Sequence, residues 1–206
     1  MIDLGFVITT FVTLFVVIDP LGLIPLFIAL TQGMAPQQRR AIGMRACVIA
    51  AILLTLFGLL GEKLLDVIGI SMPAFRIAGG ILLFLTALDM LFERRTQRRE
   101  GQKTDPSHDP SVFPLAMPLI AGPGALASMI LLVGQSGACW AGTLVVLAEM
   151  LLVVGITFAL FLAAGVIERA LGRTGTMVIT RLLGMLLAAL SVQFVIDGII
   201  GTGLIG

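Results

Sequence analysis

Charged residues are scarce in this sequence of 206 residues. They make up 12% of the chain, whereas 58% of the residues are hydrophobic. Soluble domains have about 25% charged residues, and the mean hydropathy of this chain is +1.11. The low charge excludes an ordinary soluble domain and predicts a protein that lives in the lipid bilayer.

The residue patterns of common catalytic sites are also missing. There is no HExxH zinc motif and no GxxxxGK[ST] phosphate loop. The lack of a phosphate loop predicts that this chain does not itself hydrolyse ATP. The GQSG string at 134–137 matches the GxSG string of intramembrane rhomboid proteases, and a serine nucleophile needs a base within hydrogen-bond reach. The single histidine, His108, is predicted on the opposite side of the membrane from Ser136. Cys47 and Cys139 differ too much in predicted depth to form a disulfide. We therefore expect no enzyme, no cofactor, no metal and no nucleic-acid partner.

Long apolar segments dominate what is present. A span of the ~30 Å hydrocarbon core needs about 20 mostly apolar residues. Six segments qualify, at 4–30, 42–60, 73–92, 112–133, 141–167 and 182–200. The first lacks the basic n-region of a cleaved signal peptide, so we expect it to be retained.

The distribution of basic residues predicts the orientation, because cytoplasmic loops carry the excess of Lys and Arg. Only Lys63 and Arg76 fall on one side of the six predicted spans. The other side receives Arg39, Arg40, Arg45, Arg94, Arg95, Arg98, Arg99, Lys103, Arg169, Arg173 and Arg181. Both termini are therefore predicted to lie outside.

A polar connection at 93–110 divides the chain near its midpoint into predicted repeats at 1–92 and 111–206. It is expected to be a solvated cytoplasmic loop, with binding of anionic lipid headgroups or of a partner as the alternative. Transporters are often built from internal repeats of this kind. Because each half holds three predicted spans, an odd number, the second half must be inverted relative to the first.

Direct comparison of the two halves supports the repeat. At an offset of 103 residues, Asp19-Pro20-Leu21-Gly22 aligns with Gly122-Pro123-Gly124-Ala125. At an offset of 105 residues, two further pairs align, Gly79 with Gly184 and Thr86 with Ser191.

Proline and glycine interrupt the first and fourth spans at these equivalent places, 19–25 and 118–125. An interior proline costs a helix about 3 kcal/mol or more, and lipid cannot hydrogen-bond the freed carbonyls. Such breaks are tolerated where protein or a water-filled cavity surrounds them. At about 1.5 Å per residue, Asp19 lies about 22 Å from the outer surface and Gly122 about 15 Å from the inner one. Matched breaks near the midplane indicate a transport site, although proline kinks that serve only helix packing are the alternative.

The chemistry of the breaks favours a small zwitterion. Helices that begin at Pro20 and Pro123 would point positive N-terminal ends at one cavity, which suits a carboxylate. Carbonyls left free by the preceding half-helices suit an ammonium group or a cation. The small side chains at the breaks leave room for a ligand. The predicted substrate-binding residues are Asp19, Pro20, Gly22, Gly122, Pro123, Gly124, Thr86 and Ser191.

Several of these residues have alternative roles. Asp19 before Pro20 is an ordinary helix N-cap, yet a carboxylate inside a membrane is also a candidate for substrate contact or proton coupling. Glu149 either carries a proton or pairs with Arg45 or Arg76. The hydroxyls of Thr86 and Ser191 either line the site or bond to neighbouring carbonyls and helices.

Four stretches carry a family resemblance: "IDPLGLIPLF", "FRIAGGILLFLTALDM", "MPLIAGPGA" and "ITRLLGMLLAALSVQFVIDGI". Together they resemble the MarC family of bacterial inner-membrane proteins, whose archaeal relatives are described as small neutral amino acid transporters. The resemblance implies six spans with broken first and fourth helices, and transport of amino acids such as alanine or glycine. The resemblance also implies functional roles for the residues of the broken motifs, which are Asp19, Pro20, Gly22, Gly122, Pro123 and Gly124.

The sequence therefore predicts an all-α polytopic membrane protein of six transmembrane helices, arranged as two inverted three-helix repeats. We expect a secondary transporter that works by alternating access and is coupled to H⁺ or to Na⁺ or uncoupled. Asp19 and Glu149 are the candidate proton carriers. Export of other small metabolites and a non-transporting scaffold or chaperone are the alternatives.

Overall fold

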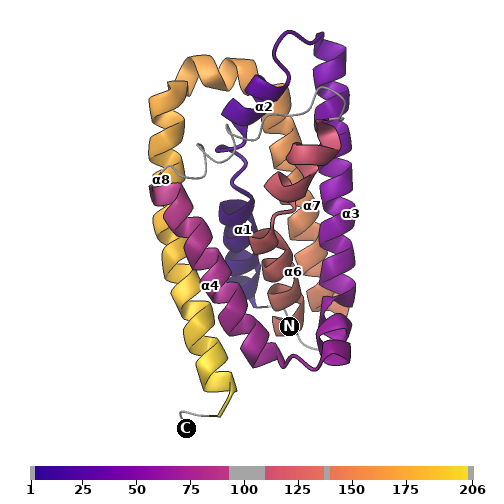
Figure 1. The fold of residues 1–206 in the computed structure, drawn as a ribbon, viewed down its shortest axis with the longest axis vertical. Helices are drawn as coiled ribbons and strands as arrows, with labels where there is room; N and C mark the ends of the chain where they lie inside the picture. Colours follow the sequence, from indigo (N-terminus) through magenta and orange to yellow (C-terminus); the bar gives the residue numbers. More distant parts are fainter. Residues whose placement is uncertain (1–2, 93–109, 137–139, 204–206) are drawn as a thin grey trace.

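The computed structural model describes residues 3–92, 110–136 and 140–203, which form helices joined by turns (Figure 1). No strand occurs among them. The helices in chain order are α1 (Leu4–Ile18), α2 (Ile24–Leu30), α3 (Pro36–Ile68), α4 (Met72–Leu91), the π-helix η1 (Ser111–Ile120), α6 (Pro123–Gln135), α7 (Trp140–Leu162) and α8 (Ala164–Gly201).

Within these ranges, four helices are long and apolar enough to cross a membrane: α3, α4, α7 and the Met177–Gly201 part of α8. The bent pair of η1 and α6 would make a fifth. The predicted first span is divided into α1, with 15 residues, and the shorter α2. Neither part reaches the length of a span alone.

Two helices extend well beyond the predicted segments. The segment predicted at 42–60 lies inside α3, and the one at 182–200 lies inside α8. Pro36 begins α3 and Gly69, in the left-handed region at φ 83°, ends it. Proline at the first turn and glycine after the last are helix boundary signals, whereas hydropathy marks only the apolar middle of a helix.

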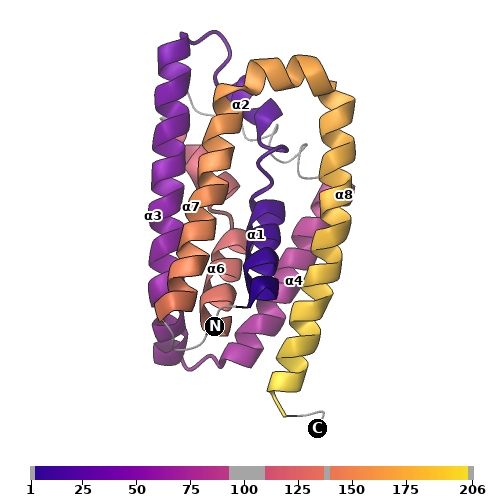
Figure 2. The same ribbon diagram turned by 180° about the vertical axis from the view of Figure 1, so that it is seen from behind.

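Helix α4 and the Met177–Gly201 part of α8 run antiparallel and lie side by side (Figures 1 and 2). Glycines allow the close approach. A Cβ atom at Gly80 would lie 2.8 Å from the carbonyl oxygen of Ser191, and one at Gly198 would lie 3.0 Å from that of Pro73. Small residues at such contacts let membrane helices pack backbone against backbone.

We expect Gly80→Ala to destabilise the protein. The added methyl group would overlap the Ser191 carbonyl and would lie 3.1 Å from the Val195 amide nitrogen, so the two helices must separate. Overpacking of this kind costs about 1–3 kcal/mol, measurable as a lower thermal midpoint in detergent. The matched control is Gly155→Ala in α7, where a Cβ atom meets nothing within 4 Å. Equal midpoints for the two variants would contradict the close packing of α4 on α8.

The two halves of the chain are interleaved. The substantial contacts of α1, α2, α3 and α4 are all with helices of the second half. Helix α3 packs on η1, α6 and α7, while α4 packs on α8 and α6. The hydrophobic core therefore forms between the halves.

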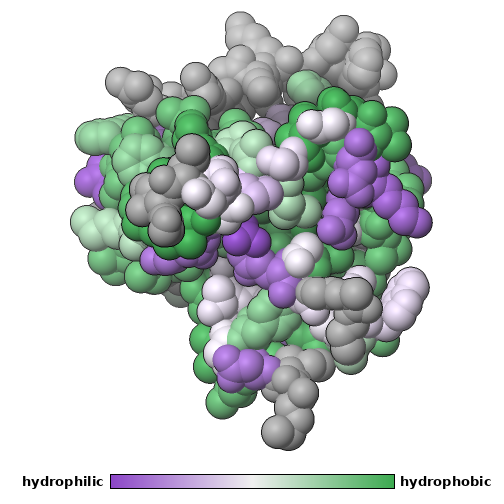
Figure 3. All heavy atoms as spheres, turned by 90° about the horizontal axis from the view of Figure 1, so that it is seen from below, coloured by the Kyte–Doolittle hydropathy of each residue, from purple (hydrophilic) through white to green (hydrophobic). Residues whose placement is uncertain are grey.

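Both chain ends lie at the same end of the molecule (Figure 1). Figure 3 views this end and shows hydrophilic patches among surfaces that are mostly hydrophobic. At the opposite end, the first part of α8 runs across the bundle before the chain turns at Gly172 (φ 62°, ψ 177°), a conformation that favours glycine (Figures 1 and 2). The predicted polar connection, with His108, and the side chains of Arg169 and Arg173 lie outside the described residues.

Candidate substrate site at the helix breaks

The first break is centred on Asp19. Helix α1 ends at Ile18, and Asp19 adopts the left-handed conformation (φ 54°, ψ 62°) that Asp and Asn tolerate better than most residues. Its N–H donates to the Phe15 carbonyl at 3.0 Å, which closes α1. Its carboxylate accepts a hydrogen bond from the Gly22 N–H at 3.1 Å. Asp19 is only 1% exposed, so this carboxylate lies inside the protein.

This geometry adds a second role to the predicted capping by Asp19. It is the C-cap of α1, and it also caps a single turn in which the Leu23 N–H donates to its carbonyl at 3.2 Å. The regular helix α2 begins at Ile24, after Pro20 and the rest of the turn. The predicted half-helix starting at Pro20 was therefore wrong by one turn, because the left-handed residue and the turn precede the helix.

Position 22 has room only for glycine beside the Asp19 carboxylate. A Cβ atom at Gly22 would overlap the side-chain oxygen Oδ2 of Asp19. Any larger residue would displace the carboxylate from the Gly22 N–H. The aspartate and the glycine therefore act as a unit at this break.

The second break lies between η1 and α6, whose axes differ by 53°. Gly122 is the extended N-cap and Pro123 the first residue of α6, as predicted. No side chain of a described residue caps this end, so the first N–H groups of α6 are available to a ligand. The preceding half is not the regular helix that we expected from Val112. It contains Pro114 and Pro118, and its backbone has non-helical angles beside them.

The last turn of α1, just before the first break, meets the first turn of α6 at Gly124. A Cβ atom there would lie 3.4 Å from Cγ1 of Val17, two residues before Asp19, and 3.5 Å from Oγ1 of Thr86 in α4. The predicted residue Thr86 thus lies beside the second break. Its hydroxyl donates to the Leu82 carbonyl at 2.9 Å, which is the local bond foreseen as an alternative.

Two other predicted residues are not brought to this point. Ser191 is buried and donates to the Ala188 carbonyl at 2.6 Å, and its own carbonyl faces Gly80 in the contact between α4 and α8. Glu149 is half-buried in α7, and its Oε2 atom has no hydrogen-bond partner among the described residues.

Three buried hydroxyls were missed by the sequence analysis. Thr10, Thr13 and Ser128 are 0% exposed, and their oxygens have no hydrogen-bond partner in the part of the chain that the structure describes. Thr10, Thr13 and Val17 share one helix face by their spacing, as do Gly124 and Ser128. Because Val17 meets Gly124, both sets face the contact between α1 and α6. That spacing was the available signal.

Comparison with known proteins gives consistent matches. The family profile described as MarC family integral membrane protein matches residues 4–202. A UPF0056 membrane protein of Archaeoglobus fulgidus is 39% identical over 199 residues, covering 95% of this chain and 93% of the relative. The UPF0056 inner membrane protein YhgN of Escherichia coli K12 is 35% identical over 193 residues, covering 94% and 95%. The UPF0056 membrane protein YvbG of Bacillus subtilis is 35% identical over 209 residues, covering 98% and 95%. No solved structure matches.

Proposed function

Since the chain belongs to the MarC family of integral membrane proteins, we propose that it is a secondary transporter of small neutral amino acids such as alanine and glycine. The contact between the end of α1, next to the first break, and the start of α6, at the second break, carries the proposal. Interrupted helices in corresponding halves of a membrane protein are typical of transport sites. A scaffold has no use for two helix ends held against one another inside the bundle.

The proposed architecture is six passes in two inverted three-helix repeats, at 1–92 and 111–206, with both termini outside. Three observations support it. Breaks occur at equivalent places in the two halves. The start of α1 and the end of α8 lie at one end of the molecule, and the start of α3, which holds Arg39 and Arg40, lies at the other (Figure 1). The last two agree with the excess of positive charge expected in cytoplasmic loops.

Within the proposed site, the substrate carboxylate is bound by the N–H groups of Gly124 and Ala125 at the positive end of α6. The substrate ammonium is bound by the Asp19 carboxylate or by carbonyls near Ile18. Val17, Leu83 and Thr86 surround Gly124 closely, which supports a small substrate.

Transport is proposed to proceed by alternating access around this site. The coupling ion is H⁺ or Na⁺. Asp19 and Glu149 are the candidate proton carriers, and carbonyls at the breaks are the candidate Na⁺ ligands. Flux of alanine that responds to neither a pH gradient nor a Na⁺ gradient would instead indicate a facilitator.

The test is counterflow of radiolabelled alanine and glycine in liposomes that contain the purified protein. We expect saturable exchange above protein-free liposomes, together with a higher thermal midpoint in the presence of the transported amino acids, because binding to the folded state stabilises it. Screening all the amino acids as stabilisers identifies the substrate class. Neither exchange nor a shift with any amino acid would contradict the proposal and favour the scaffold or the export of other metabolites.

A further inference from the structure

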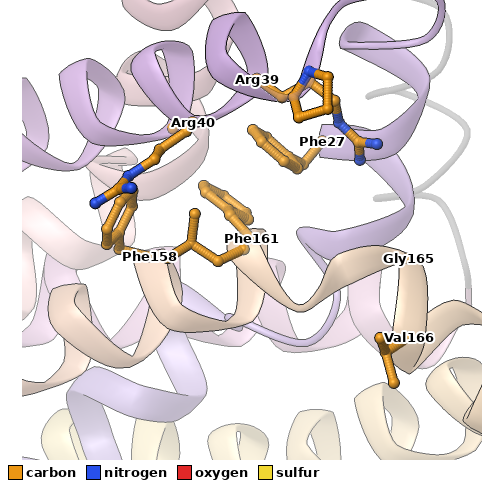
Figure 4. Close-up of a pocket in the computed structure, with 10 residues that line it drawn as sticks. Phe27, Arg39, Arg40, Phe158, Phe161, Gly165 and Val166 are labelled. Carbon is orange, nitrogen blue, oxygen red and sulfur yellow. The ribbon is translucent and has the colours of Figure 1, made fainter.

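A cavity lies at the end of the bundle where α3 begins and α7 passes into α8. Its volume is about 210 Å³. Helices α2, α3, α7 and α8 all contribute to its walls (Figure 4). The proposed transport mechanism does not use this cavity.

The cavity combines an aromatic wall with two positive charges. Phe27 and Phe161 stack with ring centroids 4.3 Å apart, and Figure 4 shows them between Arg39 and Arg40. The Arg39 guanidinium lies 5.7 Å from the centroid of the Phe27 ring, which is cation–π distance. None of the described residues that line the cavity is acidic.

The cavity also reaches the lipid-facing surface. Leu162 and Val166 line it and are 53% and 68% exposed. Between α7 and the body of α8, Gly165 leaves open space, because a Cβ atom there would meet nothing within 4 Å. A ligand in this cavity can therefore extend an apolar chain along the outside of the bundle.

We propose that this cavity is a binding site for an anionic phospholipid. Arg39 and Arg40, one on each side of the aromatic wall, supply the positive charge that binds the phosphate, since guanidinium groups bind phosphate oxygens through paired hydrogen bonds. The glycerol and the first methylene groups rest on the Phe27 and Phe161 rings, and an acyl chain leaves past Leu162 and Val166. Basic pockets between helices at the cytoplasmic face are suited to such headgroups.

The experiment uses the full chain, purified in detergent and stripped of lipid, with phosphatidylglycerol as the probe. We expect phosphatidylglycerol to raise the thermal midpoint by about 5 °C or more near saturation. Phosphatidylcholine and inorganic phosphate should each give a clearly smaller shift. The first lacks the net negative charge, and the second lacks the acyl chain.

Two variants test the charges of the site and the space inside it separately. The double variant Arg39→Gln/Arg40→Gln should lose the shift by removing the charges. Gly165→Leu should lose it by filling the cavity while both arginines stay. The matched controls are Lys63→Gln, an exposed cation near the opposite end of α3, and Gly155→Leu, a second glycine with open space around it. Both controls should keep the shift.

Three results would overturn the proposal. One is an undiminished phosphatidylglycerol shift in the double arginine variant, which does not depend on whether Gly165→Leu folds. Another is an equal shift with phosphatidylcholine or with inorganic phosphate. The third is an arginine-dependent shift produced by alanine or glycine in place of lipid, which would assign the cavity to the transport route.

Discussion

Counterflow of radiolabelled alanine is expected to fall by about tenfold to a hundredfold in Asp19→Asn. A hydrogen bond to a charged group contributes about 1.5–3 kcal/mol, and each 1.4 kcal/mol is about tenfold in affinity. Asparagine keeps an oxygen that can accept from the Gly22 N–H, so the turn after α1 should persist. Only the negative charge that is proposed to bind the substrate ammonium is lost. The protein should therefore remain monodisperse with a thermal midpoint near that of the wild type.

The matched control for this substitution is Asp3→Asn. Asp3 caps the other end of α1, and its Oδ1 accepts from the Gly5 N–H at 3.3 Å. The two aspartates thus make the same kind of bond, but Asp3 is exposed and far from the breaks. Wild-type counterflow in Asp3→Asn and loss in Asp19→Asn would locate the effect in the buried charge. Wild-type rates in both variants would remove Asp19 from the site.

Gly122→Leu is expected to abolish counterflow of both alanine and glycine. A Cβ atom at Gly122 would lie 2.6 Å from the Pro118 carbonyl oxygen, which is backbone and cannot rotate away. The remaining leucine atoms would fill the space at the start of α6. Because the site itself is filled, the smaller substrate should be spared no better than the larger one.

A graded variant and a control accompany Gly122→Leu. Gly124→Ala places its methyl group 3.3–3.5 Å from Leu83, Val17 and Thr86, so the fold can accommodate it while the space at the break shrinks. We expect reduced transport from this variant and wild-type transport from Gly155→Leu. Normal counterflow in a monodisperse Gly122→Leu protein would mean that the breaks serve packing and that the site lies elsewhere.

The breaks were predictable because they obey local rules. The start of α6 at Pro123 is predictable from a few neighbouring residues, because proline is common at the first helical position and Gly122 directly precedes it. The role of Asp19 was harder, because an aspartate before proline is normally an N-cap. The left-handed backbone at Asp19 depends on how α1 and the following turn are packed. The irregular course of η1 was missed since Pro114 was treated as part of an apolar run.

Contacts between helices were less predictable than the helices themselves. Hydropathy identified apolar segments but cannot say which face of α4 meets which face of α8. The predicted repeat pairs Thr86 with Ser191, and each hydroxyl donates to a carbonyl of its own helix, that of Thr86 to Leu82 and that of Ser191 to Ala188. Yet only Thr86 lies beside Gly124, since equivalence in a repeat does not make two residues neighbours. The hydroxyls of Thr13 and Ser128 became visible only once α1 and α6 were placed together.

Because the two halves are interleaved, helices of the first half are synthesised before the helices on which they pack. Helix α8 is synthesised after α4, and α4 has its principal contact with α8. The face of α4 that carries Gly80 therefore stays without its partner until α8 has been synthesised. Likewise, α1 and α3 acquire their neighbours only when the second half has entered the bilayer. Insertion of individual helices and their assembly are consequently distinct stages of biogenesis, and the first half spends the interval between them in contact with lipid or with the insertion machinery.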